Sequence, residues 1–213
     1  MQAPAPVIPR WQSHRPLWHN QGVIETNRRN RRPREPRKPR PPLDAETLQQ
    51  LALHYVGRFA TSRGRLADYL RRKLRERGWA GEAAPDLQVI ADRFAELGYI
   101  DDRAFAEGRA RSLGGRGYGK ARVRQALHAA GIGEEDAAPA NEIADDGRWA
   151  AALRYAEKKR IGPWARELPA DPQARRAAVQ KAIGSLIRAG HDFATARAIA
   201  GAEPGETPED VLS

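Results

Sequence analysis

The residues most able to do chemistry in this sequence lie in the glycine-rich segment Gly114-Gly-Arg-Gly-Tyr-Gly-Lys120. Its spacing matches G-x-x-x-x-G-K, in which glycine N–H groups bind phosphates, the lysine supplies charge and a following Ser or Thr binds Mg²⁺. Here Ala121 follows the lysine, and the preceding residues 105–113 have helical periodicity instead of that of a buried strand. We therefore expect a glycine-rich helix connector, with Arg116 and Lys120 facing solvent or a phosphate backbone, and not a nucleotide-hydrolysing loop.

Other catalytic and metal-binding arrangements are also poorly supported. The adjacent carboxylates Asp101 and Asp102 do not converge on one ion, and their place after Gly98-Tyr-Ile100 favours capping of a helix. The five histidines lack zinc-ligand spacing, and the absence of cysteine excludes disulfides, thiolate metal sites and a cysteine nucleophile. Serine and histidine are too scattered to indicate a nucleophilic triad. We expect no enzyme activity, no cofactor and no metal.

The segments that must position functional side chains have helical periodicity. Behind Asp44, an N-cap residue, apolar side chains recur at helical spacing. A second helix is predicted over Arg65–Arg77, and a third begins at Pro85 and ends before Gly98. No run of alternating β-branched residues bounded by hairpin turns is present. The fold is therefore predicted to be all-α.

This three-helix pattern recurs along the chain. Superposing Gly78 on Gly131, and Gly131 on Gly190, aligns apolar residues at offsets of 53 and 59 residues. Self-similarity at such a period is typical of stacked helical repeats. We expect an elongated array of three tandem three-helix repeats, in which the helix Glu134–Asn141 is short or frayed because Pro139 interrupts it. The predicted organisation is an arm over 1–42, repeats over 43–98, 99–146 and 147–201, and a C-terminal tail over 202–213.

Positive charge is distributed unevenly along the 213 residues, whose formal net charge is +10. Residues 1–42 hold 10 Lys and Arg against two Glu, whereas residues 43–213 hold 27 basic against 25 acidic residues. Residues 1–42 also contain 9 of the 16 prolines, so this arm is predicted to be disordered. It is either a sequence-tolerant arm for a polyanion or a solubilising leader. Since no apolar run is long enough for a membrane span or a signal peptide, we expect a cytoplasmic protein.

Basic residues are the remaining candidates for a binding function. Eight lie in Arg58–Arg77 and seven in Arg103–Arg124, on the first and second helices of their repeats. Stacking would join them into one positive surface suited to a phosphate backbone or an acidic protein groove, although a solvated Arg-rich face is the alternative. Tyr55, Phe59 and Tyr69 are predicted to be core residues, which argues against a base-stacking platform. The candidate contact residues are Arg63, Arg65, Arg71, Arg72, Arg75, Arg116, Lys120, Arg122 and Arg124.

Two blocks of the sequence resemble the RecX family. They are Leu97-Gly-Tyr-Ile-Asp-Asp-Arg-Ala-Phe-Ala106 and Gly117-Tyr-Gly-Lys-Ala-Arg-Val-Arg-Gln-Ala-Leu-His-Ala-Ala-Gly-Ile132, and the resemblance covers residues 45–133 well and the third repeat loosely. It implies tandem three-helix repeats that bind along the groove of the RecA filament on single-stranded DNA. It further implies suppression of the ATPase, strand-exchange and coprotease activities of RecA, and so modulation of DNA repair and the SOS response, without catalytic residues or a cofactor.

A stand-alone, sequence-tolerant DNA-binding protein is an alternative, because three-helix units resemble helix-turn-helix domains in outline. Tight binding of naked DNA at moderate salt would favour this alternative, whereas filament-selective binding would favour RecA regulation. A helical scaffold for another acidic protein would show no dependence on DNA. The expected partners are the RecA filament and, weakly, DNA itself, with no membrane; no heptad seam indicates a dimer, so a monomer is expected.

Overall fold

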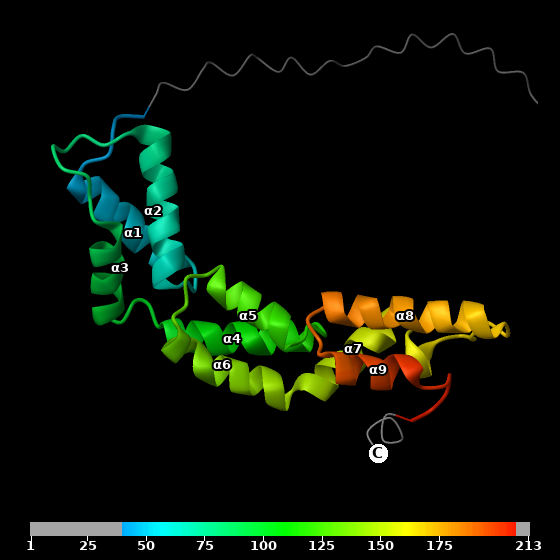
Figure 1. The fold of residues 1–213 in the computed structure, drawn as a ribbon. Helices are drawn as coiled ribbons and strands as arrows, with labels where there is room; N and C mark the ends of the chain where they lie inside the picture. The colour runs from blue at the N-terminus through cyan, green and yellow to red at the C-terminus, as the bar shows by residue number, and fades with distance from the viewer. Residues whose placement is uncertain (1–39, 208–213) are drawn as a thin grey trace, which may run out of the picture. The chain divides into compact units, whose positions relative to one another are not determined.

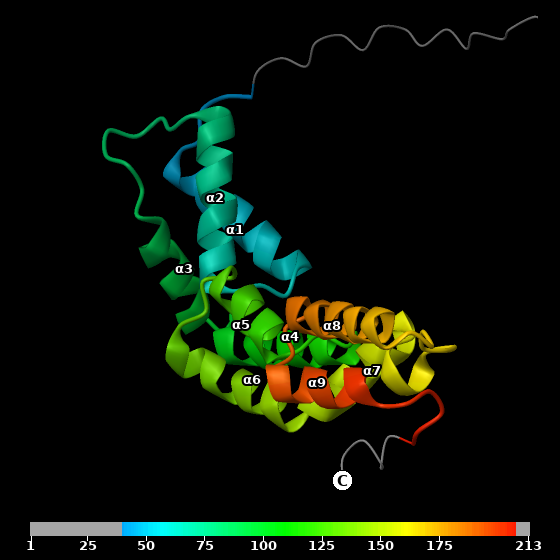
Figure 2. The ribbon, with the colours of Figure 1, turned by 45° about the vertical axis from the view of Figure 1, so that its right-hand side comes forward.

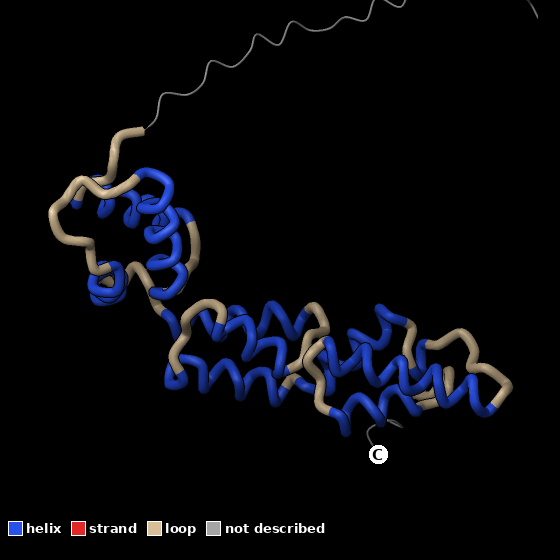
Figure 3. The backbone as a smooth tube through the Cα atoms, turned by 45° about the horizontal axis from the view of Figure 1, so that its top comes forward, coloured by secondary structure: helices blue, strands red, loops and turns tan. Residues whose placement is uncertain are grey.

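The computed structural model describes residues 40–207, which form α-helices joined by loops (Figures 1 and 3). Within these residues the only β-type pairing is a single parallel bridge between Leu43 and Trp79. The prediction of an all-α fold is therefore confirmed. Most of the predicted arm and the last residues of the predicted tail lie outside the described residues. Among the helices of residues 40–207, none is both long and apolar enough to cross a membrane.

The first three helices are α1 (Ala45–Arg58), α2 (Arg63–Arg77) and α3 (Leu87–Glu96), and they share one apolar core. Leu48, Leu66 and Leu70 are fully or almost fully buried in it. The helix α2 begins two residues earlier than predicted, because the Ser62 side chain caps it by accepting the Arg65 N–H. The prediction that Phe59 is a core residue is wrong: Phe59 follows α1 and is 51% exposed, and its ring lies tilted against the Tyr55 ring at a centroid distance of 5.4 Å.

The next three helices are α4 (Asp102–Gly115), α5 (Lys120–His128) and α6 (Glu134–Asp146), and they enclose a second core built largely of alanine and leucine. The helices α4 and α6 run side by side in both ribbon views (Figures 1 and 2), and theirs is the most extensive helix pairing among the described residues. Small side chains at Ala106, Ala110 and Ala140, all buried, fit this close pairing.

The expectation of a short or frayed helix at Glu134–Asn141 is wrong. The helix α6 is continuous over 13 residues with Pro139 inside it. Proline removes one backbone donor, but the following residue, Ala140, is completely buried in the second core, so packing holds the helix together across the missing bond. Acidic residues in the first turn also stabilise its N-terminus.

The third group comprises α7 (Arg148–Lys159), the short 3-10 helix η1 (Gly162–Trp164), α8 (Pro172–Arg188) and α9 (Phe193–Gly201). Ala152, Ala156, Leu186 and Ile199 are fully buried in its core. Each group of three α-helices therefore has its own core, in agreement with three tandem three-helix repeats.

The glycines aligned by sequence periodicity occupy equivalent positions. Gly78, Gly131 and Gly190 follow the ends of α2, α5 and α8, with φ values of 80°, 68° and 98°. Glycine enters this left-handed region without the steric cost that a Cβ atom brings, which is why it ends helices so often. The feature that recurs with the repeat period is thus a glycine that follows the end of a helix.

Candidate protein and nucleic-acid interface

The glycine-rich segment connects α4 to α5 and at the same time joins the second group of helices to the third. The N–H of Gly119 donates to the carbonyl of Ala189 at 3.0 Å, and that of Ala121 donates to the carbonyl of Gly190 at 3.1 Å. A Cβ atom at Gly119 would overlap the carbonyl of Gly190. The N–H groups of Gly119 and Ala121 are therefore bonded to the backbone that follows α8 and are not available to a phosphate, and the glycine at position 119 allows this close approach.

Lys120 and His191 complete this junction. The Lys120 ammonium pairs with the Asp145 carboxylate of α6, so it is not directed at a phosphate-binding site. The His191 side chain is buried, with Nε2 3.0 Å from the carbonyl oxygen of Gly117 and its ring tilted against Tyr155. Burial lowers the pKa of His191, against the opposing effects of the Gly117 hydrogen bond and the Asp192 carboxylate. A neutral imidazole that donates to Gly117 fits this environment.

The first and second groups of helices meet through polar contacts at the N-terminus of α2. The Ser62 hydroxyl donates to the carbonyl of Ala130 at 2.6 Å. A Cβ atom at Gly64 would lie 2.7 Å from that same carbonyl oxygen and 2.8 Å from the Cα of Gly131. The two backbones therefore touch here, as they do at Gly119. No apolar core cluster among residues 40–207 includes residues of both groups.

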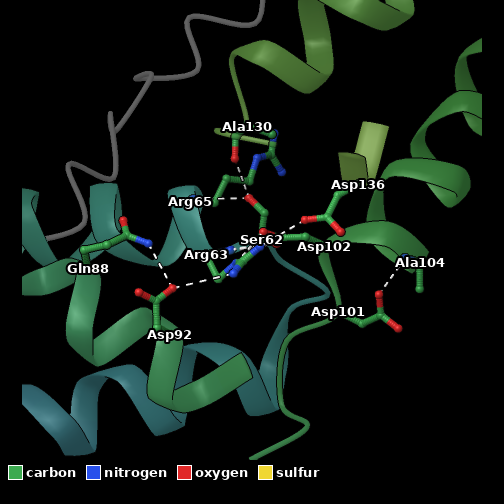
Figure 4. A network of polar contacts seen from close by, with 10 residues as sticks. All are labelled: Ser62, Arg63, Arg65, Gln88, Asp92, Asp101, Asp102, Ala104, Ala130 and Asp136. Carbon is green, nitrogen blue, oxygen red and sulfur yellow. Dashed lines mark hydrogen bonds and ion pairs between the residues drawn. The ribbon is translucent and has the colours of Figure 1, made fainter. Parts of the chain in front are cut away.

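Arg63 is the centre of this junction (Figure 4). Its Nε donates to Asp102 Oδ2 at 2.8 Å, and its backbone N–H donates to Oδ1 of the same carboxylate at 2.9 Å. The guanidinium also donates to Asp136 at 3.0 Å and lies 3.7 Å from Asp92. The hydrogen bond to Asp102, helped by the charges of Asp102, Asp136 and Asp92, raises the pKa of Arg63 above its ordinary value. One arginine thus ties together α2, α3, α4 and α6.

The adjacent pair Asp101 and Asp102 has two separate roles. Asp101 caps α4 by accepting the Ala104 N–H at 2.8 Å, as predicted. Asp102 was expected to share that role, but its side chain is only 4% exposed and holds Arg63. Sequence reasoning missed this contact. The one available signal was that a helix needs a single N-cap residue, so the second carboxylate had no local explanation.

On α2 the remaining candidate arginines are surface residues with different surroundings. Arg65 places its guanidinium 5.3 Å from the Phe105 ring, a cation–π contact between the first and second groups. Arg71 pairs with Asp68, and Arg72 lies 3.8 Å from Glu76, within the helix. Arg75 is exposed and has no ion-pair or hydrogen-bond partner among residues 40–207. The exposed face of α2 is therefore basic but not purely so.

The candidates around α5 lie on different sides of that helix. Arg122 and Arg124 are two positions apart, which places them about 160° apart around a helix of about 100° per residue. Arg122 donates to Gln125 and stands over the Tyr118 ring, whereas Arg124 lines a groove between α5 and α6 together with Lys120. Arg116, at the end of α4, is exposed. The nine candidates thus occupy the junctions, the α2 surface and two sides of α5.

Comparison with known proteins identifies the family. Residues 101–140 match the family model for the second three-helix domain of RecX. A Regulatory protein RecX of Stenotrophomonas maltophilia (strain R551-3) is 35% identical over 123 residues, which are 58% of this chain and 69% of the relative. The chain belongs to the RecX family of regulatory proteins. The matched residues include Asp102, Gly119 and the α5–α6 groove.

Two further similarities agree with the RecX assignment. A Regulatory protein RecX of Myxococcus xanthus (strain DK1622) is 27% identical over 167 residues, 74% of this chain and 86% of the relative. The crystal structure of RecX from Lactobacillus salivarius matches with a TM-score of 0.51 at 18% identity, over 73% of this chain and 94% of that chain. The sequence resemblance to RecX is therefore confirmed, and the fold is shared over nearly the whole of the solved chain.

Proposed function

We propose that this chain regulates the RecA recombinase. It binds the RecA filament on single-stranded DNA and suppresses the ATPase, strand-exchange and coprotease activities, and in this way it modulates DNA repair and the SOS response. Its membership of the RecX family is the observation that carries the proposal. The array of separately cored helix groups with exposed arginines supports a binding protein that acts without chemistry of its own.

The contacts in this proposal divide according to what each side chain already binds. Arg65, Arg71, Arg72 and Arg75 on α2 and Arg116, Arg122 and Arg124 around α5 contact DNA phosphates or acidic filament surface. Arg63 and Lys120 are positioning residues, because they pair with Asp102 and Asp145 on other helices. The ion pairs of Arg71 and Arg72, in contrast, lie within α2. They hold the helices that carry the other arginines at a constant spacing.

The regulatory effect follows from differential affinity. A ligand shifts an equilibrium only as far as it binds one state better than another, so the chain binds the filament more tightly than free RecA. Its successive helix groups contact neighbouring subunits in one arrangement. Binding stabilises that arrangement of the RecA subunits. It therefore hinders the conformational cycling that ATP hydrolysis and filament growth require.

The single-strand-dependent ATPase of the host RecA, titrated with the full chain at moderate salt, tests the proposal. We expect inhibition by the wild type at well below one molecule per RecA. The triple variant Arg71→Glu, Arg72→Glu, Arg75→Glu should lose most of this inhibition while keeping its helical circular dichroism. A matched control changes the same charge on α8, with Arg176→Glu, Lys181→Glu and Arg188→Glu. Full inhibition by the folded α2 variant, or equal loss in both variants, would contradict the contact assignment.

Stand-alone, sequence-tolerant DNA binding remains the second candidate, because Arg75, which has no ion-pair partner within residues 40–207, and the other exposed arginines of α2 suit any phosphate backbone. Binding of naked single-stranded and duplex DNA, compared with the RecA filament at the same salt, separates the two. The RecA proposal requires tighter binding to the filament. Equal or tighter binding to naked DNA would favour the second candidate.

A further inference from the structure

The groove between α5 and α6 is a surface feature separate from the α2 arginines. It has a volume of about 440 Å³, which falls in the range of about 300–1,000 Å³ typical of ligand pockets. Its apolar part is formed by Leu127, Ile132, Ala137 and Ala138. Its polar lining comes from Lys120, Arg124, His128, Glu134 and Asn141. The groove therefore combines aliphatic residues with a polar rim that carries two basic side chains and one carboxylate.

The available positive charge in this groove belongs to Arg124. The charge of Lys120 is engaged by Asp145, whereas Arg124 is exposed and has no hydrogen-bond or ion-pair partner among residues 40–207. A second hollow of about 200 Å³ shares Lys120 and Arg124 with the groove and extends to Arg148. Arg148 is likewise exposed and without a partner in the described part of the chain. Within residues 40–207, two guanidinium groups without an ion-pair partner thus line two hollows that share Lys120 and Arg124, and the carboxylates of Asp145 and Asp192 also line the second hollow.

The residues that line the α5–α6 groove favour a peptide ligand over a nucleic acid. Successive bases bind by stacking on aromatic rings, and among residues 40–207 no Phe, Tyr or Trp lines the groove. An aliphatic floor gains nothing from phosphates but binds the side chain of Leu, Ile or Val, while Arg124 and Arg148 attract carboxylates. The chemistry is that of an acidic peptide with an aliphatic anchor.

We propose that the α5–α6 groove is a docking site for an acidic segment of a partner protein. An aliphatic side chain of that segment packs on Leu127 and Ile132, and flanking Asp or Glu carboxylates face Arg124 and Arg148. This inference goes beyond RecA regulation and moves Arg124 out of the filament contacts of the proposed function, because it assigns a protein contact to this groove that requires neither RecA nor DNA.

The chain supplies its own matched control at Arg122. Arg122 is on the same helix as Arg124 but projects from another side and does not line the groove. Arg122→Glu and Arg124→Glu change the net charge equally, so long-range electrostatic attraction to the peptide falls equally in both variants. Only Arg124→Glu removes a contact in the groove. A third variant, Ala138→Trp, fills the groove from an exposed position of α6 without changing charge.

Fluorescence anisotropy with the full chain tests this assignment. The probe is a fluorescein-labelled peptide of glutamates around two neighbouring leucines, and the comparison probes replace the leucines by serine or the glutamates by lysine. We expect the acidic leucine peptide to bind with a micromolar Kd and the comparison peptides at least tenfold more weakly. Arg124→Glu and Ala138→Trp should weaken binding at least tenfold, and Arg122→Glu by no more than twofold.

Three results would overturn the proposal: no saturable binding of the acidic leucine peptide, equal loss in Arg122→Glu and Arg124→Glu, or tighter Arg124-dependent binding of an oligothymidine. Circular dichroism verifies that each variant is folded. Peptide binding and RecA inhibition are separate readouts on the wild type. Inhibition without peptide binding refutes the docking site alone, whereas peptide binding without inhibition refutes the RecA proposal alone.

Discussion

Replacing Arg63 by alanine should destabilise the chain far more than the loss of an ordinary surface arginine. The substitution leaves the Asp102 carboxylate, whose side chain is 4% exposed, with no counter-charge. It also removes the cation that Asp92 and Asp136 share. Removing one partner of a fully buried pair costs about 3–5 kcal/mol. Because the Arg63 side chain is 38% exposed and water screens its charge, we expect a loss of about 2 kcal/mol in the free energy of unfolding.

The reciprocal change, Asp102→Asn, should cost less. The asparagine oxygen still accepts the Arg63 backbone N–H, and the guanidinium keeps Asp136, so we expect a loss of about 1 kcal/mol. In the double variant no buried charge is left unpaired. Its loss should therefore be smaller than the sum of the single losses by about 1 kcal/mol.

Urea unfolding of the full chain, followed by circular dichroism at 222 nm, measures these differences. Arg71→Ala is the matched control, because Arg71 belongs to the same helix and pairs with Asp68 where both side chains are exposed. Such pairs contribute at most about 1 kcal/mol. The reasoning fails if Arg63→Ala and Arg71→Ala have equal effects, or if the losses in Arg63→Ala and Asp102→Asn simply add in the double variant.

Two further predictions concern the junction at Gly119. Gly119→Ala should lower the free energy of unfolding by about 1–3 kcal/mol, because the new methyl group overlaps the Gly190 carbonyl. Gly108→Ala, on an exposed position of α4 with open space around it, should instead raise that free energy by about 0.5–1 kcal/mol; thermal melts of the pair check both signs, and a tolerated Gly119→Ala would contradict the close approach. Since burial lowers the pKa of His191, the unfolded chain takes up a proton there as the pH falls through about 6.5 while the folded chain resists it. Stability should therefore decline as the pH falls below about 6.5, and His191→Gln, which keeps a donor near Gly117, should reduce that decline. An unchanged pH profile in His191→Gln would refute the role of His191.

The helices and their period could be predicted from the sequence because the signals for them are local. Asp44 caps α1 three residues before the N–H that it binds, and Gly78, Gly131 and Gly190 end their helices through their own backbone conformation. Apolar spacing then predicts which face of each helix is buried. Only neighbouring residues enter these arguments, so they needed no tertiary structure.

The roles of individual polar residues depended on contacts between distant positions. Arg63 pairs with Asp102, which is 39 residues away, and Gly119 lies against Gly190, which follows the end of α8. Pro139 is tolerated because Ala140 is buried in the core that α6 shares with α4, a gain that helix propensity alone does not contain. Helical geometry already separates Arg122 from Arg124, but only tertiary packing decides that the second one lines the groove. The sequence by itself determined where helices form and end, and the tertiary structure decided which charges are engaged and which remain available to a partner.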